Sequence, residues 1–240
     1  VILNAVLGFA QEYRADRAMA ALSALAQPLT RVRRDGTDVS VPSTALVPGD
    51  IVLLAAGNAR RFGADKLMVD FEGAPLGARV AHELVSIAAA AHFAVCQPEA
   101  HIAAYYRQLG FDIVDNPNPG IGLSGSLHLA VEAALRTDAQ ALLIALADMP
   151  FVQAAHVEAL IAACTDNVVA SFDGNQPMPP AIFPRSHWPD LLATEGDAGA
   201  RHILARAEKL TAPSGMLGDI DMPDDLAASK VSFHRIDRLQ

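Results

Sequence analysis

The sequence predicts an α/β protein with a doubly wound, mostly parallel sheet. After residue 50, helical and strand patterns alternate along the chain, which is typical of parallel sheets with helical crossovers. The run at 141–146 is apolar at every position, as expected for a strand that is buried on both faces. With 240 residues and 52% apolar content, the chain is long enough for one large domain and a small appendage.

The elements after residue 50 are expected in a regular order. Strands are expected at 51–54, 93–96, 112–115 and 141–146, and helices at 76–91, 101–109 and 124–135. In such sheets, ligands bind at the carboxyl ends of the strands. The loop after residue 54 and the residues after 146 should therefore lie at the same edge and face one ligand.

The first fifty residues have a different character. The apolar run 1–10 is too short to span a bilayer, charged residues follow it at once, and a signal-peptide pattern is missing. Residues 9–26 predict an amphipathic helix that ends before Pro28. Residues 30–42 predict a β-hairpin with a primed turn at Asp35 and Gly36.

Composition narrows the functional classes. A net charge of −9 argues against a nucleic-acid-binding surface, which needs a basic face. Cys96 and Cys164 are the two cysteines, and both lie in apolar segments. They are expected to be buried and unpaired, which fits a reducing cytoplasm better than a disulfide framework. The expected partner is a small molecule that brings its own metal ion.

The loop at 54–66 carries the clearest chemical signal. Its sequence is L-A-A-G-N-A-R-R-F-G-A-D-K, directly after an apolar strand. Small side chains let backbone N–H groups approach a polyphosphate, and Arg60, Arg61 and Lys66 supply positive charge. The spacing matches neither a Walker loop nor the dinucleotide-binding fingerprint. The alternative is an ordinary strand-to-helix turn with solvated charges.

This pattern resembles the signature loop of the MobA-like nucleotidyltransferases, especially the molybdenum cofactor cytidylyltransferase branch. Four further segments are similar to family motifs in the same order: 116–127, A-D-M-P at 147–150, G-D-A-G-A-R at 196–201 and D-I-D-M-P-D-D-L at 219–226. The resemblance covers about residues 50–228. It implies a three-layer α/β/α, Rossmann-like nucleotidyltransferase fold. The chain departs from the family at Ala147, where the family has glycine, and at 176–180, where the family has G-H-P.

The resemblance assigns roles to individual residues. The catalytic residues would be Arg61, Lys66 and Asp148, and the nucleotide would be bound by Leu54, Ala55, Ala56, Gly57, Arg61, Lys66, Ser124 and Ser126. Asp148 and Asp221 would hold the metal, and Asp197 and Arg201 the acceptor. A carboxylate at a strand end suits Mg²⁺, which takes one or two carboxylates and leaves its other positions to phosphate and water. Asp148 as a turn residue, and Ser124 and Asp221 as helix caps, are the alternatives.

The implied reaction is transfer of CMP from CTP to the phosphate of molybdopterin with release of pyrophosphate. It would depend on Mg²⁺ or Mn²⁺ and form no covalent enzyme intermediate. The A-A-G form of the loop favours CTP by resemblance. The resemblance also adds a molybdoenzyme or its chaperone as a candidate protein partner. Two alternatives stay open: a sugar- or alcohol-phosphate nucleotidyltransferase, and a non-catalytic fusion whose amino-terminal segment impairs the site.

Residues 1–54 resemble a second family, the P-type cation-transporting ATPases. The resemblance rests on N-A-V-L-G-F-A-Q-E-Y-R-A at 4–15, the hairpin, and L-V-P-G-D-I-V-L-L at 46–54. The T-G-E-S and D-K-T-G-T motifs of those pumps do not occur in this sequence, so pumping is not expected. The expected domains are an ATPase-like appendage at 1–48, a transferase domain at 49–230 and a tail at 231–240. Residues 51–54 are expected to form the first central strand of the transferase sheet.

Overall fold

The computed structural model describes residues 29–34, 37–42, 49–55 and 65–220, and the chain divides into two compact units, Val1–Leu46 and Val47–Gln240. In the first unit, strands β1 (Leu29–Arg34) and β2 (Thr37–Pro42) pair antiparallel, with Arg34 opposite Thr37. This confirms the expected hairpin. The primed turn at 35–36 and the helix at 9–26 lie outside the described residues.

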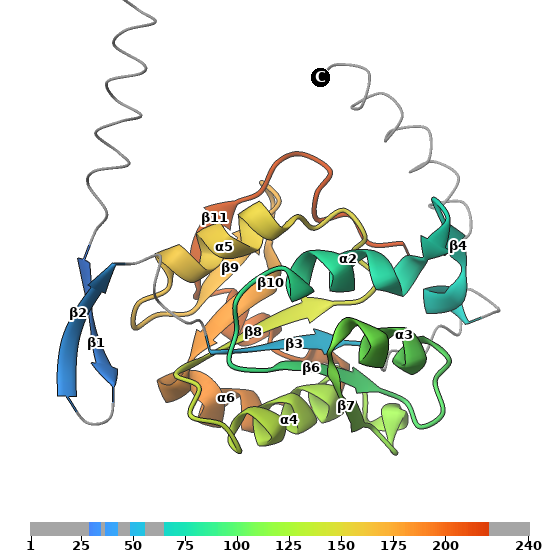
Figure 1. The fold of residues 1–240 in the computed structure, drawn as a ribbon, viewed down its shortest axis with the longest axis horizontal. Helices are drawn as coiled ribbons and strands as arrows, with labels where there is room; N and C mark the ends of the chain where they lie inside the picture. Colours follow the sequence, from blue (N-terminus) through green and yellow to red (C-terminus); the bar gives the residue numbers. More distant parts are fainter. Residues whose placement is uncertain (1–28, 35–36, 43–48, 56–64, 221–240) are drawn as a thin grey trace, which may run out of the picture. The chain divides into compact units, whose positions relative to one another are not determined.

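The second unit is built on a seven-stranded sheet in the order β11-β9-β10-β8-β3-β6-β7. These strands are β3 (Asp50–Leu54), β6 (His92–Cys96), β7 (Asp112–Asp115), β8 (Ala141–Leu146), β9 (Val169–Phe172), β10 (Pro177–Pro184) and β11 (Glu208–Thr211). All neighbours pair in parallel except β10, which is antiparallel to both β8 and β9. β3 lies between β8 and β6 (Figure 1), so the expectation that residues 51–54 form a central strand is confirmed.

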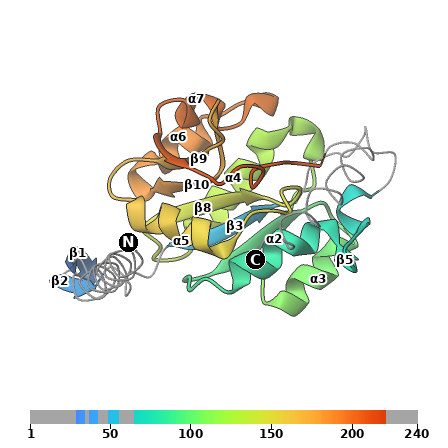
Figure 2. The same ribbon diagram turned by 90° about the horizontal axis from the view of Figure 1, so that it is seen from above.

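Helices cover both faces of this sheet and give three layers. One face carries α2 (Leu76–Val85), α3 (Ile102–Leu109) and α5 (Ala154–Ala163), and the other carries α4 (Leu123–Ala134), α6 (Trp188–Leu192) and α7 (Arg201–Leu204). Figure 2 shows α2 beside α3, and these two helices are in contact. Short elements complete the unit: the 3₁₀ turns η2 (Lys66–Met68), η3 (Pro119–Ile121), η4 (Arg185–His187) and η5 (Gly196–Ala198), and a small sheet of β4 (Asp70–Phe71) and β5 (Ala74–Pro75). The expected three-layer α/β/α fold is confirmed.

The central strand β3 shows why its sequence is apolar throughout. Ile51 and Leu53 pack into the core under α2, α3 and α5, whereas Val52 and Leu54 pack into the core over α4, α6 and α7. Because successive side chains of a strand point to opposite faces, a strand between two helical layers needs apolar residues at every position. Full burial of each such side chain contributes roughly 2 kcal/mol to stability before entropy is subtracted.

Two expectations for this unit were wrong. The helix expected at 76–91 ends at Val85, although residues 88–91 are alanines. The chain must turn there to enter β6, and His92, the first residue of that strand, hydrogen-bonds through Nε2 to the Leu84 carbonyl (3.1 Å) in the last turn of α2. Cys96 is buried as expected, but Cys164 is only partly buried because it caps the carboxyl end of α5.

Within the described residues, we find no helix of the length and apolarity needed to cross a membrane.

Candidate active site

The carboxyl ends of the central strands are joined by backbone hydrogen bonds that continue beyond the strands. The Ala55 N–H donates to the Val95 carbonyl (2.8 Å), and the Ala147 N–H donates to the Leu54 carbonyl (3.1 Å). The chain leaves β3 for β6 and β7 on one side and returns to β8 on the other, so the strand order reverses at β3. Crevices at such switch points are the usual ligand sites of open α/β sheets.

An ion pair joins two of the predicted catalytic residues at this edge. Lys66 Nζ lies 2.9 Å from Asp148 Oδ2, although the two residues are 82 positions apart in the sequence. The Lys66 side chain is 10% exposed and that of Asp148 is 28% exposed. A contact this short between opposite charges is a charge-assisted hydrogen bond, which is stronger than a neutral one. The carboxylate keeps part of its surface open to a ligand while the lysine stem is held in the protein.

The turn that carries Asp148 is anchored on both sides. Ala147 and Met149 are buried, so the alanine that replaces the family glycine fits into the core. The Asp148 carbonyl accepts a hydrogen bond from the Ile220 N–H (3.1 Å), and Ile220 packs with Phe71 and Leu76. The chain therefore returns to the Asp148 turn just before residue 221. Asp221, the second predicted metal ligand, lies outside the described residues.

The loop before α4 is held by a buried asparagine, which the family resemblance placed in the segment 116–127 without giving it a role. The Asn116 side chain donates through Nδ2 to Ser126 Oγ (3.1 Å) and accepts through Oδ1 from the Asn118 N–H (3.0 Å). Asn116, Ser124 and Ser126 are all buried. The Ser126 hydroxyl thus holds the loop in place. Because Ser126 is packed into α4, a nucleotide could contact this hydroxyl only from the surface of that helix. An asparagine followed by Pro-Asn-Pro is a turn signal that could have found this residue.

The predicted acceptor residue Asp197 packs against the amino end of α4. Gly122 precedes α4 with a φ of +92°, and a Cβ there would overlap Asp197 Oδ1. A Cβ on Gly199 would lie 2.7 Å from Leu123 Cδ2, so the two segments meet closely at both glycines. The amino end of a helix carries partial positive charge, which favours a carboxylate at this position. Arg201 is exposed at the first position of α7.

Among the residues that the structure describes, the predicted site residues form two groups, with Arg201 apart from both on α7. Lys66 and Asp148 form one pair at the end of β8, with Leu54 and Ala55 beside them in the sheet. Ser124 and Ser126 lie on the first turn of α4, and Asp197 lies against Gly122, which precedes that helix. Ala56, Gly57 and Arg61 lie outside the described residues, as does Asp221.

The donor set at this edge fits a divalent metal bound largely by phosphate. Among residues 49–55 and 65–220, no three histidine, cysteine or carboxylate side chains cluster as a metal site would require. A single accessible carboxylate such as Asp148 is what Mg²⁺ uses when substrate phosphates and water supply its other ligands. A zinc site, by contrast, needs several nitrogen or sulfur ligands.

The amino-terminal part of the chain is similar to a different class of protein. It is 51% identical over 57 residues to calcium-transporting ATPase 1 of Bacillus cereus, which covers 24% of this chain and 6% of that protein. Other cation-transporting ATPases match similarly short stretches, among them one of Bacillus subtilis (43% identity over 70 residues) and one of Mycobacterium bovis (45% over 58 residues). The chain therefore spans less than a tenth of the length of these relatives, and their activity is not carried over.

The larger unit has relatives along nearly its whole length. The chain is 30% identical over 192 residues to the purine catabolism protein PucB of Bacillus subtilis, covering 72% of this chain and 92% of PucB. The fold of this chain is shared by a nucleotidyl transferase from Methanothermobacter thermautotroptrophicus, at 19% identity and a TM-score of 0.64, with 79% of this chain and 99% of that chain covered. The Mycobacterium tuberculosis protein Rv0371C in complex with manganese also has this fold (19% identity, 76% and 97% coverage, TM-score 0.60). Since the model of the MobA-like NTP transferase domain matches residues 51–210, two thirds of the sequence, the chain belongs to the MobA-like NTP transferase family.

Proposed function

We propose that this protein transfers CMP from CTP to the phosphate of a molybdopterin cofactor and releases pyrophosphate. The observation that carries the proposal is the ion pair between Lys66 and Asp148 at the carboxyl edge of β3 and β8. It places one cation and one carboxylate within hydrogen-bonding distance of each other, at the edge where a nucleoside triphosphate would lie. These are the two charges that a phosphoryl group and its metal ion require.

The residues divide the work of an in-line displacement. Asp148 would hold Mg²⁺ or Mn²⁺, and the bound metal would neutralise charge on the phosphate oxygens. Lys66, and Arg61 from the loop before it, would stabilise the departing pyrophosphate as negative charge develops on it. The acceptor phosphate would be oriented by Arg201, whose guanidinium can bind two oxygens at once. The protein thus acts by positioning and electrostatics, without a covalent intermediate.

The base and the acceptor are assigned from two segments of the sequence. The A-A-G sequence at 55–57 favours CTP through its resemblance to cytidylyl-transferring relatives. On the acceptor side, residues 176–180 differ from the family pattern, and Pro177–Pro184 forms the antiparallel strand β10. A sugar or alcohol phosphate is therefore the competing acceptor, and the experiment must separate the two.

The test is a pyrophosphate-release assay with each of the four nucleoside triphosphates and a panel of acceptors. Release with CTP and molybdopterin, dependent on Mg²⁺ or Mn²⁺ and abolished by Asp148→Ala with the fold intact, is the expected result. Release with a sugar or alcohol phosphate but not with molybdopterin would overturn the acceptor. Unchanged turnover in Asp148→Ala would overturn the metal role of that residue. Binding of no nucleoside triphosphate in a thermal-shift assay would overturn the proposal altogether.

A further inference from the structure

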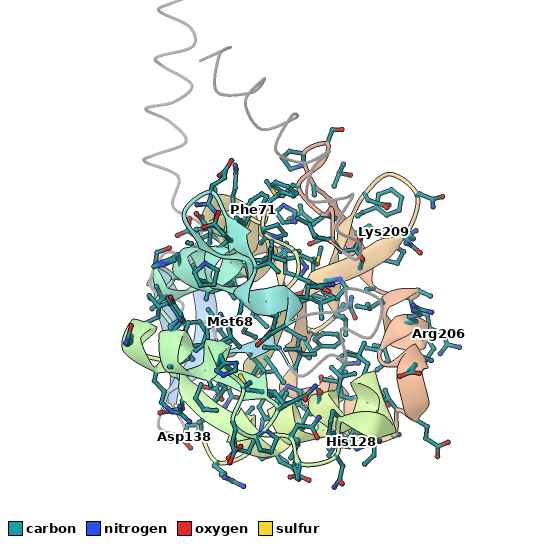
Figure 3. All side chains as sticks on the ribbon, turned by 90° about the vertical axis from the view of Figure 1, so that its right-hand side faces the viewer. Met68, Phe71, His128, Asp138, Arg206 and Lys209 are labelled. Atoms are coloured by element: carbon teal, nitrogen blue, oxygen red, sulfur yellow. The ribbon has the colours of Figure 1, made fainter. Side chains whose placement is uncertain are left out.

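The position of Lys66 is set by the first turn of helix α2. Lys66 belongs to η2, and the next residue, Leu67, lies against Gly77: a Cβ on Gly77 would be 3.1 Å from Leu67 Cβ. The Leu76 N–H donates to the Val69 carbonyl (2.9 Å), which ties the end of η2 to the start of α2. Figure 3 labels Met68 at the end of η2 and Phe71 in β4, on the short segment between Lys66 and this helix.

Tyr106, on the neighbouring helix α3, holds the first turn of α2 in place. Tyr106 is fully buried on α3, and its hydroxyl donates to the Gly77 carbonyl (3.0 Å). A Cβ on Gly77 would lie 2.8 Å from this hydroxyl. Because glycine has no side chain, both Leu67 and Tyr106 can pack against its backbone. Burial raises the pKa of the Tyr106 phenol well above its usual value, and Cys96, Asp148 and Asp65 raise it further. The phenol therefore stays protonated and remains a hydrogen-bond donor.

The other end of α2 fixes the turn that carries Asp148. Glu83 Oε2 accepts a hydrogen bond from the Ala154 N–H (2.8 Å), although the two residues are 71 positions apart. Ala154 is the first residue of α5, which begins six residues after Asp148. A carboxylate at the amino end of a helix satisfies a free N–H group and complements the helix dipole. Glu83 thus anchors the amino end of α5, the first helix after the Asp148 turn, to α2.

We propose that α2 is a positioning element that sets the separation between Lys66 Nζ and the Asp148 carboxylate. Tyr106 holds the end of α2 that packs against the segment after Lys66, and Glu83, near the other end of α2, ties this helix to α5, which follows the Asp148 turn. Neither residue belongs to the predicted site, and each acts through another residue. Their effect on catalysis rests on the proposed nucleotidyl transfer, whereas their effect on the ion pair does not.

The first experiment measures the ion pair itself and needs no substrate. The free energy of unfolding is determined for wild type, Lys66→Met, Asp148→Asn and the double variant, which gives the coupling between the two side chains. The same cycle is repeated in the Tyr106→Phe background and in the Tyr105→Phe background, a matched control because Tyr105 is 40% exposed on the same helix. We expect Tyr106→Phe to reduce the coupling by about half and Tyr105→Phe to leave it unchanged. Equal coupling in all three backgrounds would overturn the role of Tyr106.

The second experiment measures the binding of CTP to the protein in the presence of Mg²⁺. Tyr106→Phe should raise the dissociation constant by about 10-fold in the wild-type background, as loss of a supporting hydrogen bond does at comparable sites. In the Lys66→Met background the same substitution should have no further effect, because the group that it positions is gone. An equal loss in both backgrounds would mean that Tyr106 acts only on general stability. If the wild type binds no nucleotide, the proposed function fails and the stability cycle alone decides the positioning role.

Glu83 is tested by two substitutions that differ in one property. Glu83→Gln keeps a side-chain oxygen that can accept from the Ala154 N–H, whereas Glu83→Leu removes it. We expect Glu83→Leu to lower the rate constant for pyrophosphate release by about 10-fold and Glu83→Gln to restore most of it. The coupling between Lys66 and Asp148 should follow the same order. Identical behaviour of the two variants in the stability cycle would overturn the role of Glu83.

Discussion

The ion pair between Lys66 and Asp148 makes a prediction that separates stability from activity. Lys66→Met removes the charge and keeps most of the side-chain length, and Asp148→Asn removes the other charge at constant shape. Each single variant removes the 2.9 Å contact from the charged group that stays. The double variant removes both charges. It should be stable and inactive, whereas each single variant should be both less stable and inactive.

The magnitudes follow from how far each side chain is exposed. Lys66 is only 10% exposed, so Asp148→Asn should lower the free energy of unfolding by about 2 kcal/mol, the usual cost of losing a charged hydrogen-bond partner in a buried place. Asp148 is 28% exposed and water can solvate its charge, so Lys66→Met should cost only about 1 kcal/mol. The double variant should lie within about 1 kcal/mol of wild type, because replacing a buried pair by neutral groups is often near neutral.

Urea unfolding at pH 7 gives the stabilities, and pyrophosphate release with CTP gives the activity of each variant. All three variants should lose at least about 100-fold in rate, the usual consequence of removing a group that stabilises transition-state charge. If the two single losses simply add in the double variant, the contact does not stabilise the fold. If the double variant keeps its turnover, the pair does not belong to the active site.

Three further substitutions test other parts of the structure. Gly122→Ala should cost about 2 kcal/mol and weaken acceptor binding, because its Cβ would displace Asp197. Gly49→Ala should cost at least about 2 kcal/mol, because its Cβ would overlap the backbone of Ala141. Asp50→Asn should become more stable relative to wild type as the pH rises: Asp50 is fully buried and burial raises its carboxyl pKa, so the folded wild type binds a proton more tightly than the unfolded chain.

All three substitutions are tested by unfolding measurements, and Gly122→Ala is also tested by enzyme kinetics. For Gly122, the control is Gly174→Ala, which has a similar φ of +98° but open space around it, so only Gly122→Ala should change the acceptor KM. For Asp50, unfolding of wild type and of Asp50→Asn is measured between about pH 4 and pH 5.5, a range that starts at the ordinary pKa of an aspartate and extends above it. A difference between wild type and Asp50→Asn that does not change over this range would contradict a raised pKa. For Gly49→Ala, wild-type stability would show that β3 and β8 can separate at their amino ends.

Local sequence patterns predicted much of the fold. The apolar runs at 51–54 and 141–146 became neighbouring central strands, because only a strand covered on both faces needs apolar side chains at every position. The helices expected at 101–109 and 124–135 are found within one residue of those bounds, at Ile102–Leu109 and Leu123–Ala134. The helix expected at 76–91 was too long. Its alanines favour a helix locally, but the return of the chain to the sheet ends it at Val85.

The site was predictable only in part, for the same kind of reason. The loop sequence and the carboxylate after β8 indicated Lys66 and Asp148 as catalytic candidates, and the structure brings them within a hydrogen bond. Asn116 could have been found from its turn signal. Tyr106 and Glu83 could not, because a buried tyrosine and a half-buried glutamate on helices look like ordinary packing and surface residues in the sequence.

By itself, the sequence determined the α/β class, the family, and the chemical character of the loop at 54–66. It also determined the order in which the family motifs follow one another along the chain. These properties depend on residue type and on spacing along the chain, which are local. The tertiary structure decided that β3 lies between β6 and β8, that Lys66 meets Asp148, and that one helix, α2, supports both. These are contacts across 70 or more positions of sequence in two cases, and they form because the two helical layers must bury both faces of one sheet.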